Sequence, residues 1–221
     1  MGRLIPLAIA FCCTLAAQPA PNPALTEVPD EPGLPRVLLI GDSISIGYTI
    51  PVRELLKGKA NVHRILTNGA DTKNGLAHLT EWLGAGKWDV IHFNWGLHDL
   101  KVDPDGSRQV PLEQYERNLR ELVSRLNRAG ARLIFATTTP VPSSSRLSPR
   151  RITADVIGYN LVARKVMQAS GIPIDDLYEL ALPKLNEIQL PENVHYTPEG
   201  YAVLAEQVAA SILKELPPEK K

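Results

Sequence analysis

The chain has 221 residues, of which 44% are hydrophobic, and equal numbers of basic and acidic side chains, 24 of each. This length and composition suit one globular domain that buries a full core. The formal net charge of zero gives no electrostatic reason to expect nucleic acid or an anionic membrane surface as the main partner, which argues against charge-driven binding of either.

The first 17 residues have the pattern of an export signal. Arg3 gives a positive start, residues 4–15 form an apolar run, and Ala16 and Ala17 form a small-residue cleavage region. The run is shorter than the roughly 20 residues that a membrane-spanning helix needs. We therefore predict cleavage before Gln18 and export to the periplasm or the extracellular space, with no stable membrane insertion afterwards.

Both cysteines, Cys12 and Cys13, lie inside this apolar run. The mature chain is therefore expected to contain no disulfide and no cysteine metal site. Acylation of one of the two, as in a lipoprotein, stays a minor alternative, because bulky Phe11 stands where a small residue is expected before a modified cysteine.

The rest of the chain is predicted to form a linker and one folded domain. Residues 18–35 are rich in Pro, Ala and Glu without a sustained period, which is typical of an extended linker. The domain is expected over residues 36–216, followed by a tail over residues 217–221. Within the domain, short apolar runs that predict buried strands alternate with amphipathic patterns that predict helices. The expected strands cover residues 37–40, 62–66, 90–93, 133–136 and 172–174, and the expected helices cover residues 52–57, 72–83, 111–129, 153–169 and 198–216.

This alternation of strand and helix implies a parallel sheet, because parallel strands need long crossovers that helices usually fill. We therefore predict an α/β fold, a three-layer α/β/α sandwich around a central parallel sheet, with no internal repeat and no second domain. In such sheets ligands bind beyond the carboxyl ends of the strands. The loops after the first four predicted strands are therefore where the chemistry is expected.

Polar side chains in these loops and near the end of the chain suit serine chemistry. A serine hydroxyl is a weak nucleophile until a base takes its proton, and the base must be held in the right tautomer. Ser43, after the first predicted strand, is the candidate nucleophile, and His195, before the last predicted helix, is its candidate base. Glu192, three residues before the histidine, is expected to accept the other imidazole N–H.

The oxyanion formed in such a reaction needs hydrogen-bond donors. The candidates are the backbone amide of Ser43, a backbone amide of the turn at Gly69 and Ala70, and the side chain of His98. Which of Gly69 and Ala70 gives the second amide stays open.

These segments, in this order, resemble the SGNH (GDSL-like) hydrolase superfamily from about Val37 to Leu213. The resemblance implies a flavodoxin-like fold and a serine esterase that uses neither a metal nor an organic cofactor. The residues that carry it are the first block Gly41, Asp42 and Ser43, the glycine block at Gly69 and Ala70, the third block from Gly96 to Asp99, and the late acid-x-x-His formed by Glu192 and His195.

Three positions depart from the pattern of this superfamily. His98 stands where the superfamily usually has the oxyanion-hole asparagine, and a neutral imidazole donates one hydrogen bond whose position depends on its tautomer. Ala70, or Gly69 with a one-residue shift, stands at the glycine position. Glu192 replaces the usual aspartate and adds one methylene, which still permits it to orient a histidine.

Other interpretations of these residues stay open. Asp42 and Asp99 are expected to support the loops rather than to react, and His98 is alternatively a buried histidine bonded to Asp99. A metal site is the nearest competing chemistry, although it gives the serine no role. Its ligands would be His92, His98, Asp99 and His195.

We predict hydrolysis of a small acyl ester, most readily an O-acetyl group on carbohydrate, through an acyl-Ser43 intermediate. The alternatives are a lipid or lysophospholipid esterase, and a non-catalytic carbohydrate-binding module on the same fold. Residues 143–151, rich in serine and arginine, predict a mobile loop over the strand ends that helps to choose the substrate. Trp95 is the tryptophan expected near the site. The sequence does not predict an oligomeric state.

Overall fold

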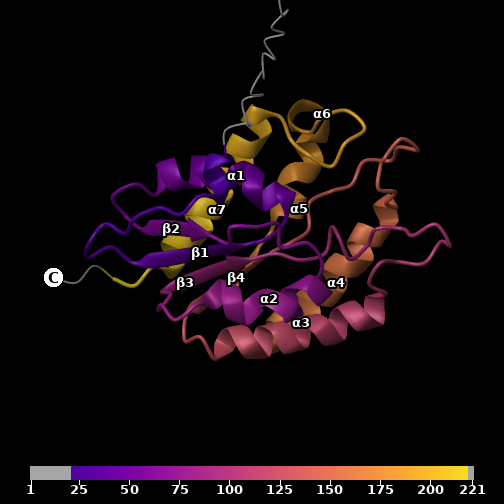
Figure 1. The fold of residues 1–221 in the computed structure, drawn as a ribbon. Helices are drawn as coiled ribbons and strands as arrows, with labels where there is room; N and C mark the ends of the chain where they lie inside the picture. Colours follow the sequence, from indigo (N-terminus) through magenta and orange to yellow (C-terminus); the bar gives the residue numbers. More distant parts are fainter. Residues whose placement is uncertain (1–20, 219–221) are drawn as a thin grey trace, which may run out of the picture.

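The computed structural model describes residues 21–218 of the chain (Figure 1). Five parallel strands form one sheet in the order β2-β1-β3-β4-β5. Nearly every residue of these strands is buried, which explains the continuous apolar runs within β1 and β4. Strands β2 and β3 also bury the polar residues Asn61, Arg64 and His92. Their bounds are β1 Arg36–Ile40, β2 Asn61–Arg64, β3 Val90–Phe93, β4 Arg132–Ala136 and β5 Ile174–Asp175.

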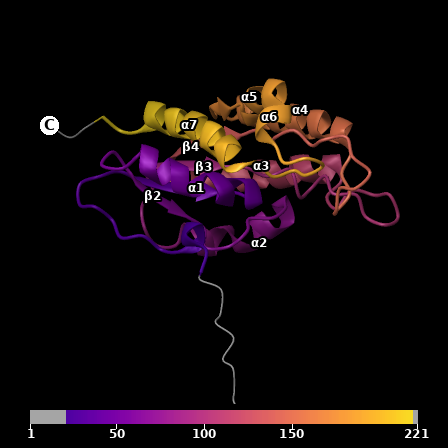
Figure 2. The ribbon, with the colours of Figure 1, turned by 90° about the horizontal axis from the view of Figure 1, so that it is seen from above.

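Helices cover both faces of the sheet, which confirms the predicted three-layer α/β/α sandwich (Figures 1 and 2). Helices α1, α5 and α7 lie on one face, and α2, α3 and α4 lie on the other. Within residues 21–218, no helix has the length and apolar character needed to cross a bilayer. The bounds are α1 Ser43–Leu55, α2 Thr72–Leu83, α3 Leu112–Asn127, α4 Thr153–Ala169, α5 Leu177–Ala181, α6 Leu185–Ile188 and α7 Pro198–Glu215, with 3-10 turns η1 at Pro23–Leu25 and η2 at Leu182–Lys184.

The register of the two central strands, β1 and β3, aligns their carboxyl ends. Val37 of β1 pairs with Val90 of β3, and Ile40 pairs with Phe93, so the carboxyl ends of these two strands lie level. The chain order reverses between β1 and β3, because β2 lies on one side of β1 and the later strands lie on the other. This is the topological switch point, where open α/β sheets bind their ligands.

The first helix, predicted to begin at residue 52, begins at Ser43 in the structure. Asp42 caps it, because its side chain accepts a hydrogen bond from the backbone N–H two residues on. Gly47 lets α7 approach closely, since a Cβ there would lie 2.1 Å from the ring of Tyr201. A glycine at this point weakens the helical signal in the sequence, so the prediction missed the first turns. As a result, Ser43 is the first residue of a helix rather than part of a loop.

Residues 21–35 differ from the extended linker that the sequence predicts, because they lie against the domain. Nη1 of Arg53 donates to the carbonyl of Pro23 over 2.9 Å. The side chain of Asn61 accepts a hydrogen bond from the backbone N–H of Glu31 and donates one to its carbonyl. The segment is therefore part of the fold, held by backbone hydrogen bonds that leave no periodic pattern. The predicted export signal and residues 18–20 lie outside the described residues.

A buried arginine ties together the two loops that follow β1 and β2. Arg64, at the end of β2, is 3% exposed, and its guanidinium donates only to backbone carbonyls. The first loop is also held by the N–H of Gly69, which donates to the carbonyl of Gly41 over 2.9 Å. The acceptors of Arg64 are the carbonyls of Gly41, Asp42, Ile65 and Thr67, at distances of 2.6 to 3.1 Å.

Candidate active site

A cleft of about 460 Å³ opens at the carboxyl ends of the central strands. Its walls come from the loops after β1, β2, β3 and β4 and from the turn before α7, which are the segments that the sequence singles out. The residues that line it are Ser43, Asn68, His98, Lys101, Arg146, Leu147, Ser148, Pro149, Arg151, Glu192, Asn193, Val194 and His195.

The predicted nucleophile and base lie together in this cleft. Oγ of Ser43 lies 2.9 Å from Nε2 of His195, although the two residues are far apart in the sequence. Helices α1 and α7 pack side by side, so the start of α1 and the turn before α7 meet (Figure 2). Ser43 is also at the N-terminus of α1, where the helix dipole favours negative charge on its oxygen.

The partner of the second imidazole nitrogen differs from the prediction. Nδ1 of His195 lies 2.8 Å from Oδ1 of Asn193, and the same oxygen accepts the backbone N–H of His195. The expected Glu192 instead places a carboxylate oxygen 2.6 Å from Nη1 of Arg146 and accepts a hydrogen bond from Ser144. Glu192 is exposed, and its backbone is in the left-handed region, with φ of +52°. Its carboxylate forms an ion pair with the guanidinium of Arg146.

Asn193 fixes the histidine tautomer without a charge. Because a carbonyl oxygen only accepts, Nδ1 of His195 carries the proton and Nε2 is left to accept the proton of Ser43. A Cys-His-Asn set in other hydrolases uses an asparagine beside the histidine in the same way. A neutral partner stabilises the imidazolium less than a carboxylate does, since it adds no opposite charge.

The two candidate backbone amides differ in how firmly they are held. The N–H of Gly69 donates to the main-chain carbonyl of Gly41, and a Cβ on Gly69 would lie 2.8 Å from that oxygen. The N–H of Ala70 donates to Oδ1 of Asn68, a side chain that can rotate away when a ligand enters. Ala70 has φ of +48°, a left-handed conformation that glycine adopts without the steric cost that a Cβ brings. The amide of Ala70 is therefore held less firmly than that of Gly69.

His98 lines the cleft and does not contact Asp99 in the way the alternative interpretation requires. Its Nδ1 lies 2.8 Å from Nζ of Lys101, which the sequence analysis did not single out. Burial lowers the pKa of His98, and the nearby cations Lys101 and Arg151 lower it further. The ring is therefore neutral at neutral pH, with Nε2 as its donor.

Asp99 supports the site from below. Its Oδ1 accepts hydrogen bonds from the backbone N–H and the hydroxyl of Thr72 at the start of α2. The amide of Asn118 donates to the same hydroxyl over 2.9 Å. Burial raises the pKa of Asp99 to about 7, since its second oxygen is buried without a hydrogen-bond partner. Asp99 thus holds the start of α2, as Asp42 holds the start of α1.

The residues of the alternative metal site do not come together. His92 is fully buried, and its Nε2 lies 2.9 Å from Oδ2 of Asp175 in the core. Across the described part of the chain, no three His, Cys, Asp or Glu side chains are grouped to hold a metal ion. Trp95, expected near the site, is buried, and its Nε1 donates to the carbonyl of Gly69 over 3.3 Å. It braces the turn at Gly69 and offers no ring to a substrate.

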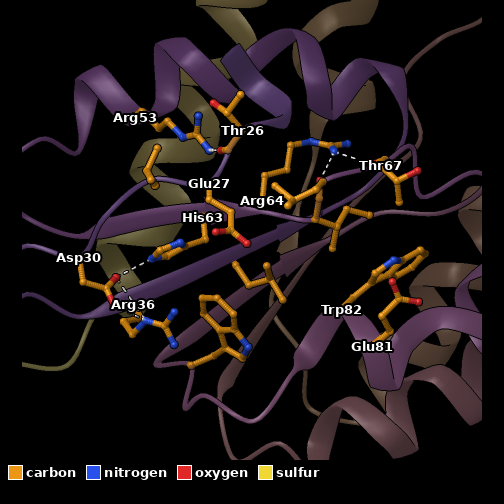
Figure 3. Close-up of a pocket in the computed structure, with 15 residues that line it drawn as sticks. Thr26, Glu27, Asp30, Arg36, Arg53, His63, Arg64, Thr67, Glu81 and Trp82 are labelled. Carbon is orange, nitrogen blue, oxygen red and sulfur yellow. Dashed lines mark hydrogen bonds and ion pairs between the residues drawn. The ribbon is translucent and has the colours of Figure 1, made fainter. Parts of the chain in front are cut away.

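A larger groove of about 580 Å³ lies beside the edge strand β2 (Figure 3). Within the groove, Asp30 contacts both His63 and Arg36, and Arg53 donates to backbone carbonyls. The guanidinium of Arg36 also lies 4.2 Å from the centre of the Trp88 ring. These pairs hold residues 21–35 against β2, so the groove is a feature of packing rather than the site of the chemistry.

A flavodoxin-like parallel sheet with a serine after β1 and a histidine before the last helix is the arrangement of the SGNH hydrolases. Residues 39–203 match the GDSL-like Lipase/Acylhydrolase family, and the chain belongs to this family. It is therefore an ester-bond hydrolase.

The relatives are distant but cover nearly the whole chain. An arylesterase of Vibrio mimicus is 24% identical over 98% of this chain and 100% of its own length. The structure of a lipase/acylhydrolase from Enterococcus faecalis covers 85% of this chain and 100% of its own, with 22% identity and a TM-score of 0.71. An acetylxylan esterase from Geobacillus stearothermophilus covers 82% of this chain and 93% of its own, with 20% identity and a TM-score of 0.65. These structures share the fold.

The raised pKa of Asp99 predicts a pH-dependent stability. Because its folded-state pKa of about 7 lies above the ordinary 3.8, this contribution is fully present at about pH 4 and is lost as the pH rises through about 7. Asp99→Asn removes this titrating group. The unfolding free energy of the variant relative to that of the parent should therefore be higher at about pH 8 than at about pH 4.5. Urea unfolding at both pH values measures this, with exposed Asp105→Asn as control. A variant-to-parent difference that is equal at the two pH values would contradict the raised pKa.

The contacts of His195 predict which neighbour orients it. Asn193→Ala should lower kcat by about 10²-fold, because Nδ1–H loses its acceptor, whereas Glu192→Ala should change kcat by less than about threefold. Asn193→Asp should shift the acid limb of the pH–rate profile to higher pH, since a carboxylate stabilises the imidazolium of His195. Steady-state hydrolysis of p-nitrophenyl acetate from about pH 5 to 9 measures all three. A larger loss in Glu192→Ala than in Asn193→Ala would restore Glu192 as the orienting residue.

Proposed function

We propose that Ser43 and His195 are the catalytic pair of an exported esterase that removes small acyl groups, most readily O-acetyl groups of carbohydrate. The observation that carries the proposal is the 2.9 Å contact between Oγ of Ser43 and Nε2 of His195 in an open cleft at the switch point of the sheet. Nucleophile and base within hydrogen-bond reach, with the base oriented by a third group, is the general signature of nucleophilic catalysis.

The first half of the proposed reaction uses these contacts. Oγ of Ser43 attacks the ester carbonyl carbon while its proton passes to Nε2 of His195, and Asn193 holds the opposite N–H. The carbonyl oxygen becomes an oxyanion, stabilised by the backbone amides of Ser43 and Ala70 and by Nε2–H of His98. When the tetrahedral intermediate collapses, the C–O bond to the leaving alcohol breaks and His195 returns the proton to that alcohol.

The second half repeats these steps with water. His195 takes a proton from a water molecule, whose oxygen attacks the carbonyl carbon of acyl-Ser43. The second oxyanion occupies the same donors, and its collapse breaks the bond to Oγ, which regains its proton from His195. The products are the alcohol and a carboxylic acid, and no redox step or metal-bound water takes part.

The lining of the cleft favours a polar substrate. Most of the side chains around Ser43 are polar or charged, and the apolar residues among them are Leu147, Pro149 and Val194. Such a surface suits a short acyl group on a sugar better than a long acyl chain. The fold is shared with acetyl xylan esterases, which supports the same substrate class, and the apolar start of the chain supports export.

The proposal is tested by comparing acyl esters on the protein that begins at Gln18. We expect p-nitrophenyl acetate to be hydrolysed with a higher kcat/KM than the butyrate or octanoate, and acetyl groups to be released from acetylated xylo-oligosaccharides. Ser43→Ala should lower each rate by about 10³-fold or more, because the nucleophile is lost. Preference for octanoate would favour the lipid esterase, and turnover that is equal in Ser43→Ala would contradict a serine mechanism. Binding of xylo-oligosaccharides without any turnover would favour the non-catalytic module.

A further inference from the structure

Lys101 lies against the histidine that stands at the family's asparagine position. Its Nζ is 2.8 Å from Nδ1 of His98. A tight turn brings the two side chains together, because the N–H of Leu100 donates to the carbonyl of Gly96 and the N–H of Lys101 donates to the carbonyl of His98. Both side chains line the cleft with Ser43.

This contact determines where His98 carries its proton. An ammonium group has three donors and no acceptor, so Nδ1 of His98 must present its lone pair to Lys101. The proton of a neutral imidazole then sits on Nε2. An imidazolium would have a proton on Nδ1 facing the ammonium, an arrangement of two donors and two positive charges that Lys101 opposes.

We propose that Lys101 is a positioning residue, whose ammonium holds His98 as the neutral Nε2–H tautomer and so gives the oxyanion site a fixed donor. The inference rests on the proposed esterase function. An asparagine side chain always has an N–H to donate, whereas a histidine does so from Nε2 in only one of its two neutral tautomers. A histidine at this position therefore needs a partner that selects the tautomer, and Lys101 supplies it.

The other charged groups around His98 do not compete for Nδ1. Asp42, before α1, accepts a hydrogen bond from the backbone of α1, and Asp71, before α2, accepts from the backbone of α2 and from a glutamine side chain. Arg151, from the loop before α4, donates to backbone carbonyls. Burial, Lys101 and Arg151 lower the pKa of His98, whereas Asp42 and Asp71 raise it. The neutral form that the geometry requires is thus the stable form at neutral pH.

A double-mutant cycle on p-nitrophenyl acetate tests the proposal by activity. Lys101→Met should lower kcat by about 10-fold or more with little change in KM, because part of the oxyanion stabilisation is lost. In the His98→Asn background the same Lys101→Met change should alter kcat by less than about twofold, since an asparagine needs no tautomer selection. The exposed Lys165→Met is the matched control. An equal loss of kcat in the two backgrounds would overturn the proposal, because Lys101 would then act on the substrate or on the fold. No loss of kcat in either background would overturn it as well.

Nitrogen-15 NMR of the histidine rings tests the same proposal without turnover. In the unmodified protein, His98 should show an unprotonated Nδ1 and a protonated Nε2 from about pH 6 to 8. In Lys101→Met the ring should show a mixture of tautomers and a raised pKa. A protonated Nδ1 in the unmodified protein would overturn the proposal whether or not the protein is an esterase. The expected tautomer in a protein without Ser43-dependent turnover would instead leave the Lys101 contact in place and refute the proposed function.

Discussion

The buried guanidinium of Arg64 joins the two loops on which the site depends. It offers its donors to four backbone carbonyls, two in the loop that ends at Ser43 and two in the loop that leads to Ala70. Burial lowers the pKa of Arg64 to about 10, so the group stays charged at neutral pH. The carbonyls of Gly41 and Asp42 also accept backbone N–H groups, so Arg64 adds a second donor to each of them. One side chain at the end of β2 therefore holds together the loop that ends at Ser43 and the loop that leads to Ala70.

In the turn before α7, a neutral side chain contacts the ring of His195 and a charged side chain contacts the loop after β4. Asn193 orients His195 through a carbonyl oxygen, which sets the tautomer but adds no charge. Glu192 forms an ion pair with Arg146 in the loop after β4, so this wall of the cleft is connected to the turn that carries His195. His98 is held by a charged neighbour instead, since Nζ of Lys101 lies 2.8 Å from its Nδ1. The departures from the family pattern at His98 and Glu192 are thus each accompanied by a contact with a neighbouring side chain.

The sequence predicted the fold because its core elements are long or rich in apolar residues. Helix α3 was predicted from its apolar stripe, and β3 from a short run of three apolar residues around His92. Residues 21–35 carry no period, since their backbone hydrogen bonds go to side chains such as Asn61. The choice between Glu192 and Asn193 could not be made from spacing, because it depends on the direction in which each side chain leaves the turn. Asn193 contacts the ring of His195, whereas Glu192, with φ of +52°, meets Arg146. An asparagine two residues before a histidine, typical of a side-chain-to-backbone turn, was the available signal for Asn193.

The proposed mechanism requires an activated Ser43, and covalent labelling tests that activation most directly. The protein should react with diethyl p-nitrophenyl phosphate to give one diethylphosphoryl adduct, which intact mass and peptide mapping should place on Ser43. Because His195 takes the serine proton, His195→Ala should slow the labelling by about 10³-fold. An adduct on another residue, or labelling of Ser43 at the same rate in His195→Ala, would contradict the serine–histidine mechanism.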